Sequence, residues 1–248
     1  MRGLAALVLL LPLAACGGDD DEQTLTVLAA ASLTGTFTEL ATTFEDEHPG
    51  VDVVVVLGSS TTLAEQAVDG APGDVLATAD ARAMEVAVDG GAASLEPEAF
   101  ALNELVIVTP PGNPADVTGL GSLASPGVDW ARCVTSAPCG ALAETVLDVR
   151  ASQAEPVTEE VDVKAVLARV VAGEVDAGLV YRTDALAAGD DVETVETGQG
   201  AASTIYEITT LGGSALASDF VELVRSPEGQ AVLRDAGFDA PRIFGDGQ

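Results

Sequence analysis

Short runs of apolar and β-branched residues alternate along most of this chain with segments whose apolar residues recur every three or four positions. The first pattern predicts strands and the second predicts helices. Residues 25–29 and 51–57 are predicted strands, and residues 33–48 form a predicted helix that ends before Pro49 and Gly50. Because residues 51–57 are nearly all apolar, this strand is expected to be covered on both faces. The alternation predicts an α/β fold with mostly parallel sheets.

The same alternation continues to the end of the chain. Asp80 stands directly before a helical pattern and is predicted to cap that helix. No strong linker divides the chain, so two lobes joined by extended strands fit better than separate domains in series. Further strands are expected over residues 74–77, 105–109, 178–181 and 204–209, and further helices over residues 62–68, 81–89, 139–149, 163–172, 220–224 and 231–236.

The N-terminus has the pattern of an export signal. Arg2 precedes an uncharged run over residues 4–15, which is shorter than the roughly 20 apolar residues that span a bilayer. The run ends Leu13-Ala14-Ala15-Cys16-Gly17, and small residues before a single cysteine resemble a bacterial lipobox, in which the cysteine is acylated. An ordinary cleaved signal with an incidental cysteine is the alternative.

With a lipobox, residues 1–15 are a lipoprotein signal peptide and residues 16–23 are an acidic tether. The mature protein is then expected outside the cytoplasm, held on the outer face of the membrane by lipid on Cys16. Cys133 and Cys139 remain, with a short loop between them, and in an oxidising compartment they are expected to form a disulfide. A two-cysteine metal or redox site is the alternative, although no further soft ligands lie nearby in the sequence.

The charge excludes several classes of function. The chain has 10 Lys and Arg against 40 Asp and Glu, a formal net charge of -30. It therefore lacks the basic surface that binding to nucleic acids or anionic lipids requires. Its one histidine, His48, argues against histidine-based metal sites and against a Ser-His-Asp triad. A hydrophobic content of 48% supplies a core, which argues against disorder despite the charge.

Two strand-to-helix junctions pass through small, hydroxyl-bearing residues. Residues 29–34 contain Ser32, and residues 58–63 contain Ser60. Free backbone N–H groups at a helix start carry partial positive charge and bind anions without lysine or arginine. In α/β sheets such ligands lie outside the carboxyl ends of the strands. Alternatively, Ser32 and Ser60 simply cap their helices.

Two further places in the second half of the chain are candidates. Residues 137–140, Ala-Pro-Cys-Gly, open a predicted helix, and Tyr181 follows an apolar strand so that its hydroxyl is expected at the carboxyl end of that strand. A half-buried core tyrosine with an ordinary hydrogen-bond partner is the alternative for Tyr181.

Together these segments resemble the molybdate-binding proteins that serve ABC importers. The order and spacing of the motifs match across residues 24–238, and several motifs in register make the resemblance specific. The matching stretches are Ala29-Ala30-Ala31-Ser32-Leu33, Gly58-Ser59-Ser60-Thr61-Thr62-Leu63-Ala64, Gly70-Ala71-Pro72-Gly73-Asp74-Val75, Ala79-Asp80, Pro138-Cys139-Gly140, Val161-Asp162-Val163-Lys164 and Gly178-Leu179-Val180-Tyr181-Arg182-Thr183-Asp184.

The resemblance implies a bilobal periplasmic-binding-protein fold of type II, with two mixed sheets flanked by helices and a cleft between the lobes. Residues 24–102 and 205–248 form the first lobe, and residues 103–204 form the second. It implies an oxyanion held in the cleft by neutral donors: hydroxyl and backbone N–H groups of Ser32 and Ser60, the backbone N–H groups of Cys139 and Val163, and the hydroxyl of Tyr181.

This sequence departs from the family at Cys139, where alanine is often found, but a backbone donor tolerates the change. Asp74, Asp80 and Asp184 also match the family motifs. They are expected to be turn and cap residues, because a carboxylate aimed at a dianion would repel it.

The resemblance implies a binding protein without cofactor, not an enzyme, that captures molybdate and tungstate and delivers them as a monomer to a membrane permease. The molybdenum would be bound as its oxyanion by these five residues. Another oxyanion, such as sulfate or phosphate, or a small organic acid, is the nearest alternative ligand. An exported hydrolase with Ser32 or Ser60 as nucleophile lacks a base, because His48 is predicted at the far end of the first helix. An adhesion or sensor lipoprotein is the remaining alternative.

Overall fold

The computed structural model describes residues 23–150, 154–197 and 203–241. The predicted signal peptide, Cys16 and all of the predicted tether except Gln23 lie outside these residues. Within them, no helix is both long enough and apolar enough to cross a bilayer.

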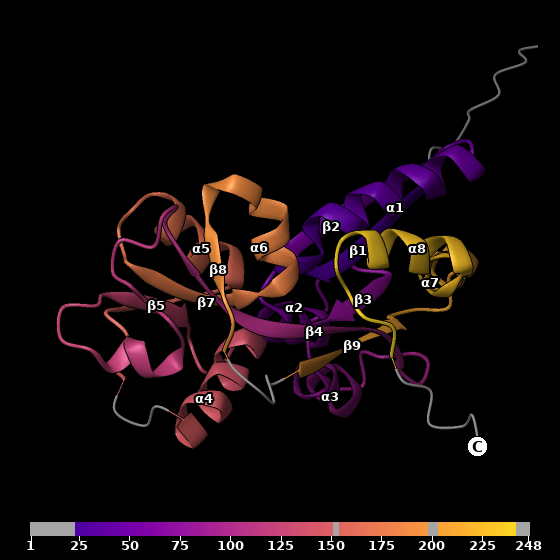
Figure 1. Ribbon diagram of the computed structural model, residues 1–248. Helices are drawn as coiled ribbons and strands as arrows, with labels where there is room; N and C mark the ends of the chain where they lie inside the picture. The colour runs from indigo at the N-terminus through magenta and orange to yellow at the C-terminus, as the bar shows by residue number, and fades with distance from the viewer. Residues whose placement is uncertain (1–22, 151–153, 198–202, 242–248) are drawn as a thin grey trace, which may run out of the picture.

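Eight of the nine strands in the described ranges form one continuous hydrogen-bonded path, which curls into two sheets, and the ninth, β8, pairs with β4 beside this path (Figure 1). The first sheet has the order β2-β1-β3-β9-β4. Strand β1 pairs in parallel with β2 and β3, and β9 runs antiparallel to β3 and β4. Its strands are β1 (Gln23–Ala30), β2 (Val51–Gly58), β3 (Val75–Thr78), β9 (Ser203–Thr210) and the first part of β4 (Glu98–Thr109).

Strand β4 belongs to both sheets. Up to Glu104 it pairs with β9, and from Leu105 it pairs with β7 and β8. The second sheet continues from β7 to β5 and β6 in parallel. Its other strands are β5 (Trp130–Cys133), β6 (Thr158–Glu160), β7 (Ala177–Tyr181) and β8 (Glu193–Val195). The predicted lobe boundaries at residues 102–103 and 204–205 fall close to this change of partner, and they stay a prediction.

Helices cover the sheets on both sides. Helices α1, α7 and α8 pack against one another beside the first sheet, α2 and α3 lie on its other face, and α4, α5 and α6 pack on the second sheet. The helices are α1 (Thr34–Glu47), α2 (Ser60–Val68), α3 (Ala81–Asp89), α4 (Pro138–Arg150), α5 (Val163–Val171), α6 (Arg182–Ala188), α7 (Ala215–Arg225) and α8 (Pro227–Asp235), with 3-10 turns at Ala31–Leu33, Leu120–Ala124 and Gly189–Asp191.

An aromatic cluster joins α1 to the first sheet. The ring of Phe37 lies 6.0 Å from Phe100 on β4 and 5.9 Å from Phe220 on α7, centroid to centroid. Phe44, two turns further along α1, lies 5.5 Å from Phe220. Each fully buried phenylalanine contributes about 1.5–3 kcal/mol through burial. The apolar residues that recur at helical spacing in the sequence therefore form the face of α1 that packs against its neighbours.

Two sequence expectations are wrong. Strand β2 is not covered on both faces: it is the edge of its sheet, and Val54 and Val56 are 41% and 36% exposed. The sheets are not mostly parallel either, because β4, which belongs to both sheets, and β9 in the first sheet pair antiparallel with all of their neighbours.

The sequence pattern also missed several elements. It placed the start of β4 at residue 105 instead of Glu98, and it omitted β5, β6, β8 and α6. Strands β6 and β8 have only 3 residues each, too short for a period to be recognised. The remaining predicted strands and helices are confirmed, including the cap of α3 by Asp80, whose carboxylate accepts from the Ala83 N–H at 2.9 Å.

Candidate functional site

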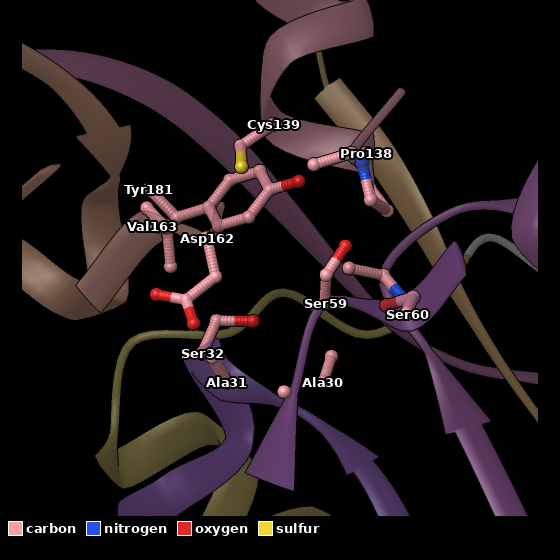
Figure 2. A pocket seen from close by; sticks show the side chains of 13 residues that line it. Ala30, Ala31, Ser32, Ser59, Ser60, Pro138, Cys139, Asp162, Val163 and Tyr181 are labelled. Atoms are coloured by element: carbon pink, nitrogen blue, oxygen red, sulfur yellow. The ribbon is translucent and has the colours of Figure 1, made fainter. Parts of the chain in front are cut away.

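A small cavity of ≈ 20 Å³ lies where elements of the two sheets face each other (Figure 2). A single water molecule needs about 10–15 Å³ of such space, so the cavity suits one small ion or molecule. All five predicted site residues line it: Ser32, Ser60, Cys139, Val163 and Tyr181. The structure thus brings them together, and their contact with an anion stays a prediction.

Ser32 enters the cavity from the 3-10 turn that follows β1. Its Oγ lies 2.7 Å from the hydroxyl oxygen of Tyr206, and its side chain is buried. The cap of this turn is Ala30, and no side chain caps it. The alternative that Ser32 is only a helix cap is therefore wrong.

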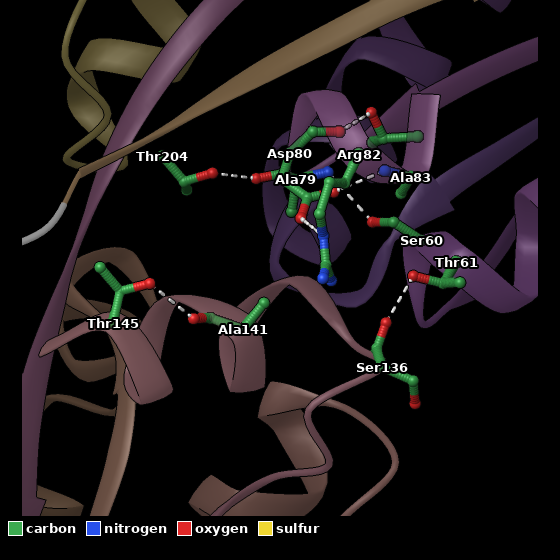
Figure 3. A network of polar contacts seen from close by, with 11 residues as sticks. Ser60, Thr61, Ala79, Asp80, Arg82, Ala83, Ser136, Ala141, Thr145 and Thr204 are labelled. Carbon is green, nitrogen blue, oxygen red and sulfur yellow. Dashed lines mark hydrogen bonds and ion pairs between the residues drawn. The ribbon is translucent and has the colours of Figure 1, made fainter. Parts of the chain in front are cut away.

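Ser60 is the first residue of α2, and its Oγ accepts a hydrogen bond from the Ala79 N–H at 3.0 Å (Figure 3). The residue before it, Ser59, is the N-cap but makes no capping bond with its side chain. The capping alternative is wrong for Ser60 as well. The first N–H groups of α2 have no acceptor inside the helix and form the positive end of its dipole beside the cavity.

The opposite wall comes from two further helix starts. Cys139 lies in the first turn of α4, and Val163 is the first residue of α5, so their N–H groups also lack acceptors within their own helices. Asp162 caps α5 by accepting from the Ala165 N–H at 2.9 Å. Three helix N-termini therefore converge on one small space, which is the arrangement that binds anions.

A disulfide and a glycine hold the start of α4 in place. Cys133 at the end of β5 is bonded to Cys139, with a Cα–Cα distance of 5.8 Å. A Cβ on Gly140 would lie 2.0 Å from the carbonyl oxygen of Val134, so only glycine fits at this position without a backbone shift. Both features fix where the Cys139 N–H points.

Tyr181 stands at the end of β7, as predicted, and is 1% exposed. Its hydroxyl has no hydrogen-bond partner among the described residues, so the alternative of a core tyrosine with an ordinary partner is wrong. Burial, with smaller contributions from Tyr206, Asp80 and Asp184, raises the pKa of Tyr181 well above its usual value. The hydroxyl is therefore a protonated donor, and leaving it unpaired costs about 1–3 kcal/mol unless a ligand accepts from it.

Neutral groups dominate the cavity wall. No lysine or arginine stands among its described lining residues, and Asp162 is the one carboxylate there. The other motif aspartates point elsewhere. Asp74 accepts from the Thr26 N–H at 2.8 Å, which ties the turn before β3 to β1.

The sequence predicted that Asp184 is a simple turn or cap residue, but the structure gives it a different environment. Its carboxylate is completely buried and forms an ion pair with Lys164 at 2.8 Å. Burial raises the pKa of Asp184, while Lys164 and a backbone hydrogen bond with Tyr181 act in the opposite direction.

Two residues behind the cavity were not singled out by the sequence. Tyr206 on β9 contacts Ser32, and Asn103 on β4 contacts Tyr206. These contacts join residues far apart in the chain, so no local motif could have revealed them. Ala79, which follows β3 and donates to Ser60, stood in the matching Ala79-Asp80 stretch, but its contact with Ser60 was not predicted. The one signal in the sequence was that the chain has only two tyrosines, Tyr181 and Tyr206. In the structure both are buried, and their ring centroids lie 6.0 Å apart.

One hydrogen bond crosses between the two walls at the surface. Thr61 on α2 donates through Oγ1 to the carbonyl oxygen of Ser136, just before α4, at 2.8 Å (Figure 3). It joins the helix start that carries Ser60 to the loop that leads to Cys139.

The site lacks the parts of a hydrolase. His48 lies at the far end of α1, where its ring stacks on Phe44 at 4.0 Å and its Nδ1 contacts the Phe44 carbonyl at 2.9 Å. It therefore cannot act as a base for Ser32 or Ser60. In the described part of the chain, no group of three or more His, Cys, Asp or Glu residues is placed to hold a metal ion.

A mixed two-sheet α/β fold with a small, donor-lined cavity facing both sheets is the architecture of a solute-binding protein. The chain belongs to the family of bacterial extracellular solute-binding proteins, whose sequence model matches residues 25–239. The predicted fold class is thereby confirmed, and so is the prediction that the chain is not an enzyme, because its relatives are binding proteins.

Individual relatives agree with this assignment. The chain is 34% identical to the molybdate-binding protein ModA of Mycobacterium tuberculosis, with 96% of this chain and 97% of that protein covered. Among solved structures, the periplasmic molybdate-binding protein of Azotobacter vinelandii matches with a TM-score of 0.76 at 25% identity, covering 88% of this chain and 100% of that one. The sulfate-binding protein SubI of M. tuberculosis matches with a TM-score of 0.78 at 17% identity, covering 89% and 88%, which is a likeness of fold alone.

Proposed function

We propose that this chain captures molybdate in the cavity and delivers it to an ABC importer in the membrane. The observation that carries the proposal is the convergence of all five residues assigned by the sequence resemblance on one cavity of ≈ 20 Å³. The sequence identity to the M. tuberculosis molybdate-binding protein supports molybdate as the ligand.

Neutral donors are sufficient to hold a dianion in this place. The hydroxyls of Ser32, Ser60 and Tyr181 and the free N–H groups of three helix starts supply hydrogen bonds to a charged acceptor, which are about twice as strong as neutral ones. The net charge of -30 opposes the approach of an anion from afar, but salt screens that field beyond about 10 Å. Binding therefore depends on short-range, preorganised contacts.

Sulfate is the nearest alternative ligand, because the sulfate-binding relative shows that this overall fold does not select one oxyanion. Molybdate, tungstate and sulfate are all tetrahedral dianions with four oxygen acceptors. Selection among them follows from cavity size, and we propose that tungstate binds like molybdate.

We further propose that the two halves around the cavity are lobes that close on the ligand and open on its release. The lobes would be residues 24–102 with 205–248 and residues 103–204, connected through β4 and β9. The closed form would dock on the permease as a monomer. Cys16 would carry the lipid that keeps the protein on the outer face of the membrane.

The test is isothermal titration calorimetry of the mature protein with molybdate, tungstate, sulfate and phosphate. Tight binding of the first two and little heat from the last two is the expected result. If sulfate binds more tightly than molybdate, the proposed ligand would have to be sulfate. Absence of heat with all four anions would refute an oxyanion site altogether.

A further inference from the structure

A chain of buried hydrogen bonds runs from Ser32 away from the cavity. The Ser32 Oγ lies 2.7 Å from the Tyr206 hydroxyl, and the Asn103 amide nitrogen lies 3.4 Å from the same hydroxyl and 2.8 Å from the Thr183 Oγ1. All four side chains are buried. Tyr206 stands on β9 and Asn103 on the neighbouring strand β4, so these hydrogen bonds run from the first sheet to the strand that both sheets share.

The direction of each hydrogen bond in this chain follows from Asn103. Its Oδ1 lies 3.0 Å from the backbone nitrogen of Glu104, and a backbone N–H can only donate. This contact fixes the orientation of the amide, so the atom that faces Thr183 and Tyr206 is the NH₂ group. An amide NH₂ also only donates.

The Tyr206 hydroxyl therefore accepts from Asn103 and has one proton left to donate. Burial raises the pKa of Tyr206 far above its usual range, so this proton is present at every working pH. Among the described residues, the Ser32 Oγ is the other hydrogen-bond partner of this hydroxyl. A buried hydroxyl proton without an acceptor is costly, so Tyr206 donates and Ser32 accepts.

Because Ser32 accepts from Tyr206, its own proton is free to point into the cavity, where Figure 2 shows its Oγ. The same logic holds at Ser60, whose Oγ accepts from the Ala79 N–H. The Tyr181 hydroxyl has its proton free because it has no described partner. All three hydroxyls are thus set to donate.

We propose that Tyr206 and Asn103 are positioning residues that orient the Ser32 hydroxyl as a donor and so select fully deprotonated oxyanions. The inference rests on the proposed oxyanion site. An anion that keeps a proton, such as hydrogen phosphate, needs an acceptor in the wall. Asp162 is the one carboxylate among the described lining residues, and its Oδ1 accepts from the Ala165 N–H as the cap of α5, so its Oδ2 is the one carboxylate oxygen left to accept from such an anion.

The test is a double-mutant cycle measured by calorimetry on the full mature protein with sodium molybdate. Tyr206→Phe should weaken molybdate binding about 2- to 10-fold, the range of one neutral hydrogen bond. In a Ser32→Ala background the same substitution should change the dissociation constant by less than about twofold, because it acts through Ser32. In a Ser60→Ala background its full effect should persist.

Thr209→Val is the matched control. Thr209 is a buried hydroxyl residue on the same strand β9, and it donates to the Leu95 carbonyl at 2.8 Å, away from the cavity. This control should leave molybdate affinity unchanged. Titration with inorganic phosphate supplies a second readout: Tyr206→Phe frees Ser32 to accept a proton, so the preference for molybdate over phosphate should fall.

An effect of Tyr206→Phe that is equally large with and without Ser32 would overturn the inference, as would an unchanged preference over phosphate. If thermal melting shows that Tyr206→Phe does not fold, Asn103→Leu enters the same cycle in its place, because it removes the donor that directs the Tyr206 proton toward Ser32. Wild-type protein that binds no oxyanion would overturn the proposed function and this inference together. Wild-type binding with an additive cycle would overturn the inference alone.

Discussion

Removing the hydroxyl of Ser60 gives the most direct test of the binding site. This side chain is 1% exposed, and its Oγ accepts from the Ala79 N–H at 3.0 Å while its proton is free toward the cavity. Ser60→Ala therefore deletes one proposed donor to the anion and leaves one buried N–H, that of Ala79, without its acceptor. The two losses affect different quantities, the binding free energy and the free energy of unfolding.

The magnitude of each loss follows from the type of hydrogen bond. A bond to a charged acceptor contributes about 1.5–3 kcal/mol, which is about 10- to 150-fold in the dissociation constant for molybdate. The unsatisfied Ala79 N–H lowers the free energy of unfolding by about 1–3 kcal/mol. This is a fraction of the about 5–15 kcal/mol typical of a folded domain, so the variant should still fold.

The assay is calorimetry with molybdate, together with thermal melting of the ligand-free protein. Thr62→Ala is the matched control, because Thr62 is exposed and lies two residues further along α2. An affinity of Ser60→Ala within about twofold of the wild type would refute the reasoning. An equal loss of molybdate affinity in Thr62→Ala would also refute it, since the cause would then be a disturbed helix start and not the loss of a hydroxyl that contacts the anion.

Three further changes test other parts of the structure. Gly140→Ala should lower both stability and molybdate affinity, because its Cβ would lie 2.0 Å from the Val134 carbonyl oxygen and must displace the start of α4; melting and calorimetry measure this. Burial, together with nearby acidic groups, raises the pKa of Glu207, so its ionisation destabilises the fold fully above the raised pKa, and this effect declines as the pH falls through the raised pKa and is gone below the usual glutamate pKa. Glu207→Gln should therefore raise the melting temperature at pH 7 and have little effect near pH 4. Thr61→Val should weaken molybdate binding about 2- to 10-fold by removing the 2.8 Å bond to the Ser136 carbonyl that joins the two walls, as measured by calorimetry.

Each of these variants has a control. Gly121→Ala places a Cβ where no atom lies within 4 Å, so equal losses in Gly140→Ala and Gly121→Ala would argue against a specific clash. A gain in melting temperature for Glu207→Gln that is as large at pH 4 as at pH 7 would contradict the role of its charge. Thr62→Val should keep full affinity, and an unchanged affinity in Thr61→Val would mean that the bond across the walls does not stabilise the bound form.

Local features of the fold were predictable because they depend on residues a few positions apart. The spacing of Phe37, Leu40 and Phe44 predicted the buried face of α1, and the position of Asp80 predicted the cap of α3. Strand pairing was less predictable. The run of valines in β2 is compatible with a covered strand or an edge strand, and only its neighbours decide which of the two forms.

The candidate site divides in the same way. Short motifs at strand ends and helix starts pointed to Ser32, Ser60, the stretch with Cys139, and Tyr181, because such junctions are readable within a few positions. Val163 and the role of all five residues as donors came from the family resemblance, and these roles stay a prediction. The motifs could not tell whether the two serines only cap their helices. That question depended on Tyr206 and Ala79, which contact them in the structure.

The sequence by itself therefore determined the alternation of strands and helices, the local helix starts and the family resemblance. Tertiary structure alone decided the mixed strand directions, the convergence of three helix starts on one cavity and the direction of the hydrogen bonds behind Ser32. Tyr206 stands 174 positions from Ser32 in the chain. The orientation of a hydroxyl depends on which donors and acceptors meet it in space, and here the pairing of β9 with β4 in the first sheet brings those groups together.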